Sequence, residues 1–368
     1  MSYPRPTYLE PGIPTEKAAL LFANLEVDIP KLDYPIAPIE NFKRVVSRNK
    51  PLWIPNSLTD FHNLMYQDLG IGAQISADFH IKATEDYDFT DWFGVPLRWC
   101  VSAGGATNAP GTHLLEDITQ WEKIIKMPDL RDWDWQTKAD EFMKNKYDPK
   151  KIVQIDLHNG LIQRLIAVLG GYTEGMFALS LEPEAVRDFF ERLADHMIEM
   201  VDLFCSLYPV NLMTIHDDWG TEKDTFFSPK MMEELVFKPT KRIIDHIKSK
   251  GVSFMLHSCG NITRFIPYMI DMGVDLLQIQ RRAVDIPAMK AKYGQKIGFN
   301  TGIEGLVPGV EYAKDELAQM VHHTVDLYGA GGGFYANVYG RDAKTIWDIS
   351  CELYAYSREF YDNAQSEI

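Results

Sequence analysis

From residue 150 onward, short apolar runs alternate with longer stretches that repeat apolar residues at helical spacing. The runs predicted to be strands are 152–157, 211–216, 252–257, 275–280, 296–301 and 333–338. The stretches predicted to be helices are 183–207, 229–250, 263–272, 311–328 and 343–361. Repeated strand–helix units predict a parallel sheet, and strands as apolar as these suit a sheet that is covered on both faces.

The pattern before residue 150 is weaker and is interrupted by prolines and glycines. A helix is predicted over residues 15–25, where Ala18, Leu21, Phe22 and Leu25 form an apolar face. The first strand is predicted at 51–55, which reads "PLWIP", and a further strand near 75–81. Residues 85–115 lack a helical period, so we expect a β-hairpin or a long ordered loop there.

These strands bring the count to eight, so we expect an α/β fold of the (β/α)8 barrel type. An open, doubly wound sheet is the alternative. Residues 1–40 are expected to form an extension packed on the barrel, and residues 41–368 a single barrel domain.

Composition narrows the classes of partner. The 368 residues are 46% hydrophobic and 24% charged, which is typical of a globular protein, and the net charge of −15 argues against nucleic acid or an anionic membrane surface. The four cysteines are scattered, and no signal peptide or apolar span is evident, so we expect a cytoplasmic protein. The sequence leaves a homodimer open.

Polar residues gather where the predicted strands end. They are His158, Asn159, His216, Asp217, Asp218, Trp219, His257, Cys259, Gln278, Gln280, Asn300, Glu304, Asn337, Tyr339 and Arg341. In barrels of this type, the chemistry lies at the carboxyl ends of the strands. The sequence therefore predicts one convergent pocket at that end of the sheet.

His257 and Cys259 are two residues apart on a strand, so their side chains share a face. The pair can be half of a zinc site or a packed pair within a core. If Leu212, Thr214 and His216 point inward, Asp218 does so too, and Asp217 points away. Asp218 then acts as an acid or base or caps a turn, and both readings stay open.

Two turns carry a resemblance to a known family. "HDDWG" at 216–220 and "HSCGN" at 257–261, with "PLW" at 51–53 and glycines at 331–333, resemble the uroporphyrinogen decarboxylase superfamily. That superfamily includes cobalamin-dependent methyltransferases and is more distantly similar to cobalamin-independent methionine synthase. The resemblance implies an eight-stranded barrel.

Two departures from the family pattern narrow the choice of activity. No arginine occurs between residues 51 and 81, although a porphyrinogen substrate needs cations for its carboxylates. The zinc methyltransferases of the superfamily carry a second cysteine after the last strand, where this chain has Tyr339. Methionine synthase has a glutamate where this chain has Gln280. Two of four family ligands, His257 and Cys259, are thus present.

The resemblance implies a methyltransferase that moves a methyl group between a small donor, such as a methoxylated aromatic, and a corrinoid protein. Zinc would be held by His257, Cys259 and an oxygen ligand, for which Glu304 is the first candidate and Asp217, Asp218 and Gln280 are the others. The catalytic candidates are Asp218, Tyr339 and His216, and the substrate-binding candidates are Asp217, Trp219, Gln280 and Asn337. A metal-free lyase acting on a porphyrinogen-like acid and a barrel that only binds are the alternatives.

Overall fold

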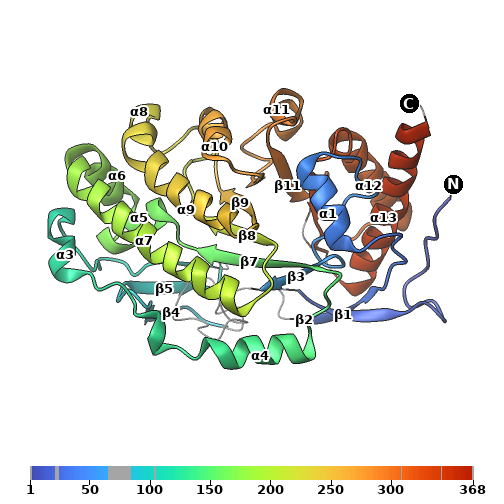
Figure 1. Cartoon of the computed structure of the whole chain (residues 1–368), viewed down its shortest axis with the longest axis horizontal. Helices are drawn as coiled ribbons and strands as arrows, with labels where there is room; N and C mark the ends of the chain where they lie inside the picture. The colour runs from blue at the N-terminus through green and yellow to red at the C-terminus, as the bar shows by residue number, and fades with distance from the viewer. Residues whose placement is uncertain are drawn as a thin grey trace.

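A seven-stranded parallel sheet forms the centre of the computed structural model (Figure 1). The structure describes residues 2–20, 25–64, 84–102, 105–307, 309–340 and 342–366. The strands, in their order across the sheet, are β12 (Phe334–Asn337), β11 (Gly298–Gly302), β10 (Leu276–Ile279), β9 (Ser253–Ser258), β8 (Leu212–His216), β7 (Ile152–His158) and β3 (Phe61–Leu64). The predicted parallel α/β fold is confirmed.

The two edges of this sheet are connected by the segment that precedes β3. Ala336 in β12 donates its N–H to the Pro55 carbonyl at 2.9 Å and accepts from the Ser57 N–H at 3.0 Å. The sheet is therefore barrel-like, with an isolated bridge at Asn56 in place of an eighth strand in the described part of the chain. The strand expected near 75–81 lies outside the described residues.

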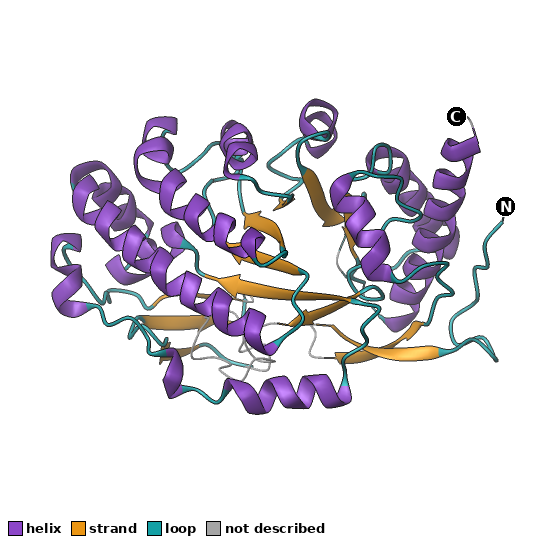
Figure 2. Cartoon of the chain, in the orientation of Figure 1, coloured by secondary structure: helices purple, strands orange, loops and turns teal. Residues whose placement is uncertain are grey.

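Helices surround the sheet (Figure 2). They are α1 (Pro38–Ser47), α3 (Trp121–Ile124), α4 (Trp135–Asn145), α5 (Leu161–Leu169), α6 (Tyr172–Leu181), α7 (Pro183–Leu207), α8 (Pro229–Met231), α9 (Phe237–Ser249), α10 (Ile266–Met272), α11 (Ile286–Tyr293), α12 (Lys314–Tyr328) and α13 (Ala343–Ser366). None of the described helices is long and apolar enough to cross a membrane.

The stretch predicted as one helix over 229–250 is divided in the structure. A π-helical turn over residues Met232–Val236 separates α8 from α9. Pro239 explains the division, because its ring clashes with the carbonyl four residues earlier and it has no N–H to donate. A wider turn at that point accommodates both effects.

The helix predicted over residues 15–25 is wrong. The chain instead forms an antiparallel hairpin of β1 (Thr15–Leu20) and β2 (Leu25–Pro30). Apolar residues alternate with polar ones in β2, so that Val27 and Ile29 are both buried and pack with Ile346 of α13. This two-residue period outweighs the helical spacing that led to the prediction.

The strand predicted at residues 51–55 is also wrong. The segment is irregular, although Trp53 and Ile54 are buried in it. Pro51 and Pro55 have no N–H for a ladder, and the true first strand of the sheet, β3, begins at Phe61. An apolar run flanked by prolines is buried here without pairing as a strand.

The β-hairpin expected within residues 85–115 is present, and a third strand pairs with it. An antiparallel sheet contains β4 (Tyr87–Thr90), β5 (Pro96–Cys100) and β6 (Gly105–Asn108).

An apolar layer fills the inside of the barrel-like sheet. Inward-facing residues of six strands pack together with Phe42 of α1. They are Phe61, Ile152, Leu212, Met255, Leu276 and Tyr335. Because side chains alternate along a strand, the next inward positions toward the carboxyl ends lie directly above this layer. Those positions are mostly polar, and His257 and Gln278 of the candidate site are among them.

The turns after β8 and β9 touch each other through two glycines. Gly260 has a φ of +83°, and a Cβ built on it would lie 2.1 Å from the Gly220 carbonyl oxygen. The Asn261 N–H donates to the Thr221 carbonyl beside this contact. The glycines thereby bring the residue before one turn, Asp218, close to Cys259.

We expect Gly260→Ala to lower the free energy of unfolding by clearly more than the roughly 1–2 kcal/mol of left-handed strain alone. The added methyl group would collide with the Gly220 backbone. Gly251→Ala is the matched control, because Gly251 has a φ of +76° and a Cβ added to it would meet nothing within 4 Å. Urea denaturation measures both variants, and equal losses would contradict the close approach.

Candidate functional site

A row of polar residues crosses five strands at one level of the sheet. His158 of β7 pairs in register with His216 of β8, which pairs with His257 of β9. The row continues through Gln278 of β10 and Asn300 of β11, and Asn300 is in register with Tyr335 of β12. Residues in register on parallel strands share a face, so the row is fixed by the strand pairing itself.

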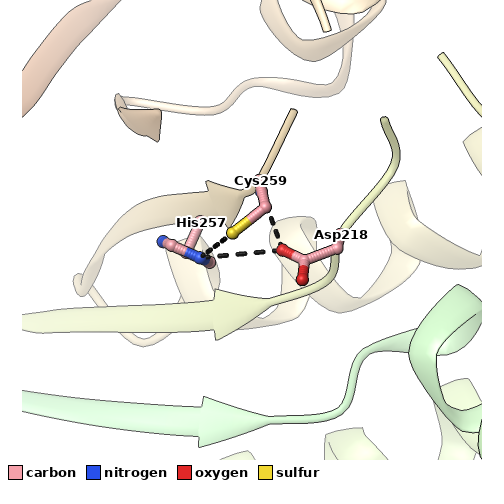
Figure 3. A group of neighbouring side chains, drawn as sticks. All are labelled: Asp218, His257 and Cys259. Atoms are coloured by element: carbon pink, nitrogen blue, oxygen red, sulfur yellow. Dashed lines mark hydrogen bonds and ion pairs between the residues drawn. The ribbon is translucent and has the colours of Figure 1, made fainter. Parts of the chain in front are cut away.

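Three metal-ligand side chains converge at this row. Asp218, His257 and Cys259 each offer one atom, and these atoms lie within 4.8 Å of one another (Figure 3). The His257 Nε2 is 3.5 Å from the Cys259 Sγ and 3.7 Å from the Asp218 Oδ1. It is the one group of this kind in the part of the chain that the structure describes.

The donor set fits a zinc ion. Ligand atoms of a tetrahedral zinc with ordinary Zn–N, Zn–O and Zn–S bonds lie roughly 3.5 Å apart, close to the 3.5 Å and 3.7 Å that separate the His257 Nε2 from the other two ligand atoms. The backbone positions the carboxylate, because the Cys259 N–H donates to the Asp218 Oδ1 at 2.7 Å. Three protein ligands of mixed N, O and S character leave a fourth position for a substrate or water, as catalytic zinc sites do.

The three histidines of the row form a stack. The rings of His158 and His216 are 4.0 Å apart and nearly parallel, and those of His216 and His257 are 4.5 Å apart. Burial, followed by the neighbouring imidazoles, lowers the pKa of His216 to about 3, and burial also lowers the pKa of His257. Both rings are therefore neutral near pH 7, which is the form that binds metals.

Asp217 and Trp219 were predicted to bind substrate, and the structure instead buries both behind the site. The Asp217 carboxylate accepts hydrogen bonds from the backbone N–H groups of Ile162 and Gln163 at the start of α5, and from the Trp219 indole. Burial raises the pKa of Asp217 to about 7. Trp219 is 1% exposed and packs against Phe227 and Phe265.

Glu304, the first oxygen ligand predicted, belongs to a different cluster. Its carboxylate accepts from the Tyr328 hydroxyl at 2.7 Å and lies 3.9 Å from Arg281. The carboxylate that joins His257 and Cys259 is that of Asp218.

The remaining predicted residues lie around the strand ends. The Gln280 side chain accepts from the Gly260 N–H and so supports the turn that follows Cys259. Asn337 accepts from the Ser57 hydroxyl at 3.2 Å. The Tyr339 ring lies over Gly302, where an added Cβ would come within 2.7 Å of it. Arg341 lies outside the described residues.

Polar residues inside β7 were missed by the sequence reasoning. Gln154 donates to Asp156 at 2.9 Å, and the Asp156 Oδ1 lies 3.8 Å from the His216 Nε2, beneath the stack. The signal was present in "IVQIDLH", where polar residues occupy every second position of an otherwise apolar strand.

The fold and the ligand atoms together define a parallel α/β protein with a candidate metal centre at the carboxyl ends of its strands. Residues 166–321 match the family model described as uroporphyrinogen decarboxylase (URO-D). The predicted resemblance to that superfamily is therefore confirmed.

Solved structures show a similar fold. A methyltransferase from Methanosarcina mazei has a TM-score of 0.62 at 10% identity, covering 89% of this chain and 99% of its own. Two further structures are too dissimilar to support an argument. An L-ribulose 3-epimerase has a TM-score of 0.38 at 13% identity, covering 66% of this chain and 85% of its own. An endo-1,4-beta-xylanase from Caldicellulosiruptor owensensis has a TM-score of 0.31 at 15% identity, covering 61% of this chain and 75% of its own. No curated protein matches the chain.

A buried histidine lines a small cavity beside the stack. The cavity has a volume of about 20 Å³, and its walls include His158, Trp92, Phe93 and His196. His196 is 2% exposed, and neither ring nitrogen has a hydrogen-bond partner among the described residues. Burial, then the charges of Arg192 and Arg164, lowers the pKa of His196 to about 4.

We expect His196 to make the protein less stable in mild acid. Between its ordinary pKa of 6.5 and the folded value of about 4, the unfolded chain binds a proton that the folded chain does not, so stability falls as pH falls. The contribution between about pH 7 and pH 5 is about 2 kcal/mol. Urea denaturation measures the free energy of unfolding at the two pH values. Its fall from the higher to the lower pH should be smaller in His196→Phe than in the wild type by that amount. An unchanged loss would mean that His196 is protonated in the folded protein.

Proposed function

We propose that the protein is a zinc-assisted methyltransferase of the uroporphyrinogen decarboxylase superfamily, acting between a small methyl donor and a corrinoid protein. The observation that carries the proposal is the convergence of Asp218, His257 and Cys259 at the strand ends. The fold shared with the methyltransferase from Methanosarcina mazei supports the same reaction class.

The three residues supply what a catalytic metal ion needs. The neutral His257 ring offers a nitrogen lone pair, the Asp218 carboxylate offers a hard oxygen, and Cys259 offers a single sulfur. A bound zinc ion would act as a Lewis acid on an oxygen or a thiol of the substrate. One sulfur among harder donors keeps the ion electrophilic, which favours an ether oxygen as its target.

The transfer then needs a donor with a cleavable methyl–oxygen bond. In a methoxylated aromatic, the methyl carbon passes to Co(I) of the corrinoid while the electron pair of the broken bond stays on the phenolic oxygen. Co(I) supplies the two electrons of the new bond and becomes Co(III). Tyr339, beside Gly302 at the strand ends, is our candidate for the proton that neutralises the leaving oxygen.

A decarboxylase of porphyrinogen carboxylates is the less favoured alternative. Such a substrate needs free cations at the mouth of the sheet. Arg164 is buried in an ion pair with Asp91, and Arg281 donates to the carbonyls of Ile303 and Leu306. Both arginines thus have partners within the protein, which argues against their binding substrate carboxylates. The lack of arginine between residues 51 and 81 points the same way.

Protein purified without chelator should contain about one zinc per chain. Cys259→Ser and Asp218→Asn should each lose most of it, because each removes a charged ligand. Cys205→Ser is the control, since Cys205 is a half-buried free cysteine on α7. Metal analysis before and after reconstitution measures the content. Absence of zinc from the reconstituted wild type would overturn the metal-assisted mechanism and leave the fold untouched.

With a methoxylated aromatic and a reduced corrinoid protein, we expect the absorption change from Co(I) to methyl-Co(III). Cys259→Ser should reduce its rate by about 10²-fold or more, the scale of an essential catalytic group. Uroporphyrinogen should release no carbon dioxide. Efficient decarboxylation by the metal-free protein would instead favour the lyase, and neither activity would favour a barrel that only binds.

A further inference from the structure

An uninterrupted chain of side-chain hydrogen bonds runs from the candidate metal centre to the edge of the sheet. The His257 Nδ1 lies 2.7 Å from the Gln278 Oε1, and the Gln278 Nε2 lies 2.7 Å from the Asn300 Oδ1. The Asn300 Nδ2 lies 3.0 Å from the backbone carbonyl of Tyr335. Each link crosses from one strand to its neighbour, because the four residues are in register.

The chemistry at the far end fixes the direction of every bond in this chain. The Tyr335 carbonyl can only accept, so the Asn300 amide must present its NH₂ group there and its oxygen toward Gln278. Gln278 must then donate to Asn300, which leaves its own oxygen toward His257. Reversing either amide would set two oxygens, or two NH₂ groups, against each other.

We propose that Gln278 and Asn300 are positioning residues that hold His257 as the tautomer with its proton on Nδ1 and its lone pair on Nε2. That lone pair lies on the side of Cys259 and Asp218, at 3.5 Å and 3.7 Å. The ring is thus ready to bind a metal without changing its tautomer. Only this last consequence rests on the proposed function, since the tautomer is a property of the metal-free protein.

Asn300 is the more informative of the two residues. It does not touch His257, and it is fully buried between the Gln278 amide and the Tyr335 carbonyl. If it were a structural residue alone, its loss would cost stability and leave the imidazole unchanged. If it orients the chain of amides, its loss frees Gln278 to turn and releases the His257 tautomer.

The first measurement is the tautomer of His257 in the metal-free wild type, read from ¹⁵N–¹H couplings of the imidazole by NMR. We expect the proton on Nδ1. In Asn300→Leu and Gln278→Leu, a substantial share of the Nε2-protonated form should appear. Gln278→Glu should keep the wild-type tautomer, because its carboxylate still accepts from Nδ1. An Nε2 proton in the wild type would overturn the proposal, whatever the variants do.

The second measurement is the affinity for zinc alone, by competition with a chelating dye. Asn300→Leu should weaken it by about 10- to 100-fold, the usual effect of losing a group that orients a ligand. Asn41→Leu is the matched control, because Asn41 is an equally buried asparagine on α1. Its side chain donates to the Trp53 carbonyl and accepts from the Leu52 N–H.

The Asn41 variant should lose stability and keep the wild-type zinc affinity. Unchanged tautomer and affinity in folded Asn300→Leu would overturn the role of Asn300. A wild type that binds no zinc would instead count against the proposed function, and the NMR result would still decide this inference.

Discussion

The register of the parallel strands is the constraint on which the candidate site depends. One pairing pattern places His158, His216, His257, Gln278 and Asn300 at the same level on neighbouring strands. A slip of one residue in any pair would turn that strand's polar residues into the apolar layer between sheet and helices. The buried apolar residues on both faces therefore protect the site, because they make every other register costly.

The candidate site consists of two levels of side chains, one above the other. The lower level is the histidine stack, in which burial lowers the pKa values of His216 and His257. The upper level lies in the turns, where Asp218 and Cys259 come from different strands and meet only because Gly220 and Gly260 let their backbones touch. Strand pairing thus places the imidazole, and turn geometry places the carboxylate and the thiol.

The sequence predicted the parts of this arrangement that depend on periodicity. The alternation of side chains along β8 correctly separated Asp218, which joins the ligand group, from Asp217, which faces α5. It could not choose between Asp218 and Glu304 as the third ligand, because that choice depends on the path of two turns. The N-terminal hairpin was missed since apolar residues at 18, 21, 22 and 25 satisfy a helical period as well.

A metal ligand must meet two demands that compete in a histidine. The ring must be neutral, which burial achieves by lowering the pKa, yet a neutral ring has two tautomers and burial does not choose between them. The choice requires a partner of fixed polarity on the other nitrogen. In this chain, the fixed polarity originates at the Tyr335 carbonyl, three strands away, and Asn300 and Gln278 transmit it to His257. The same in-register row that contains the ring therefore also orients it.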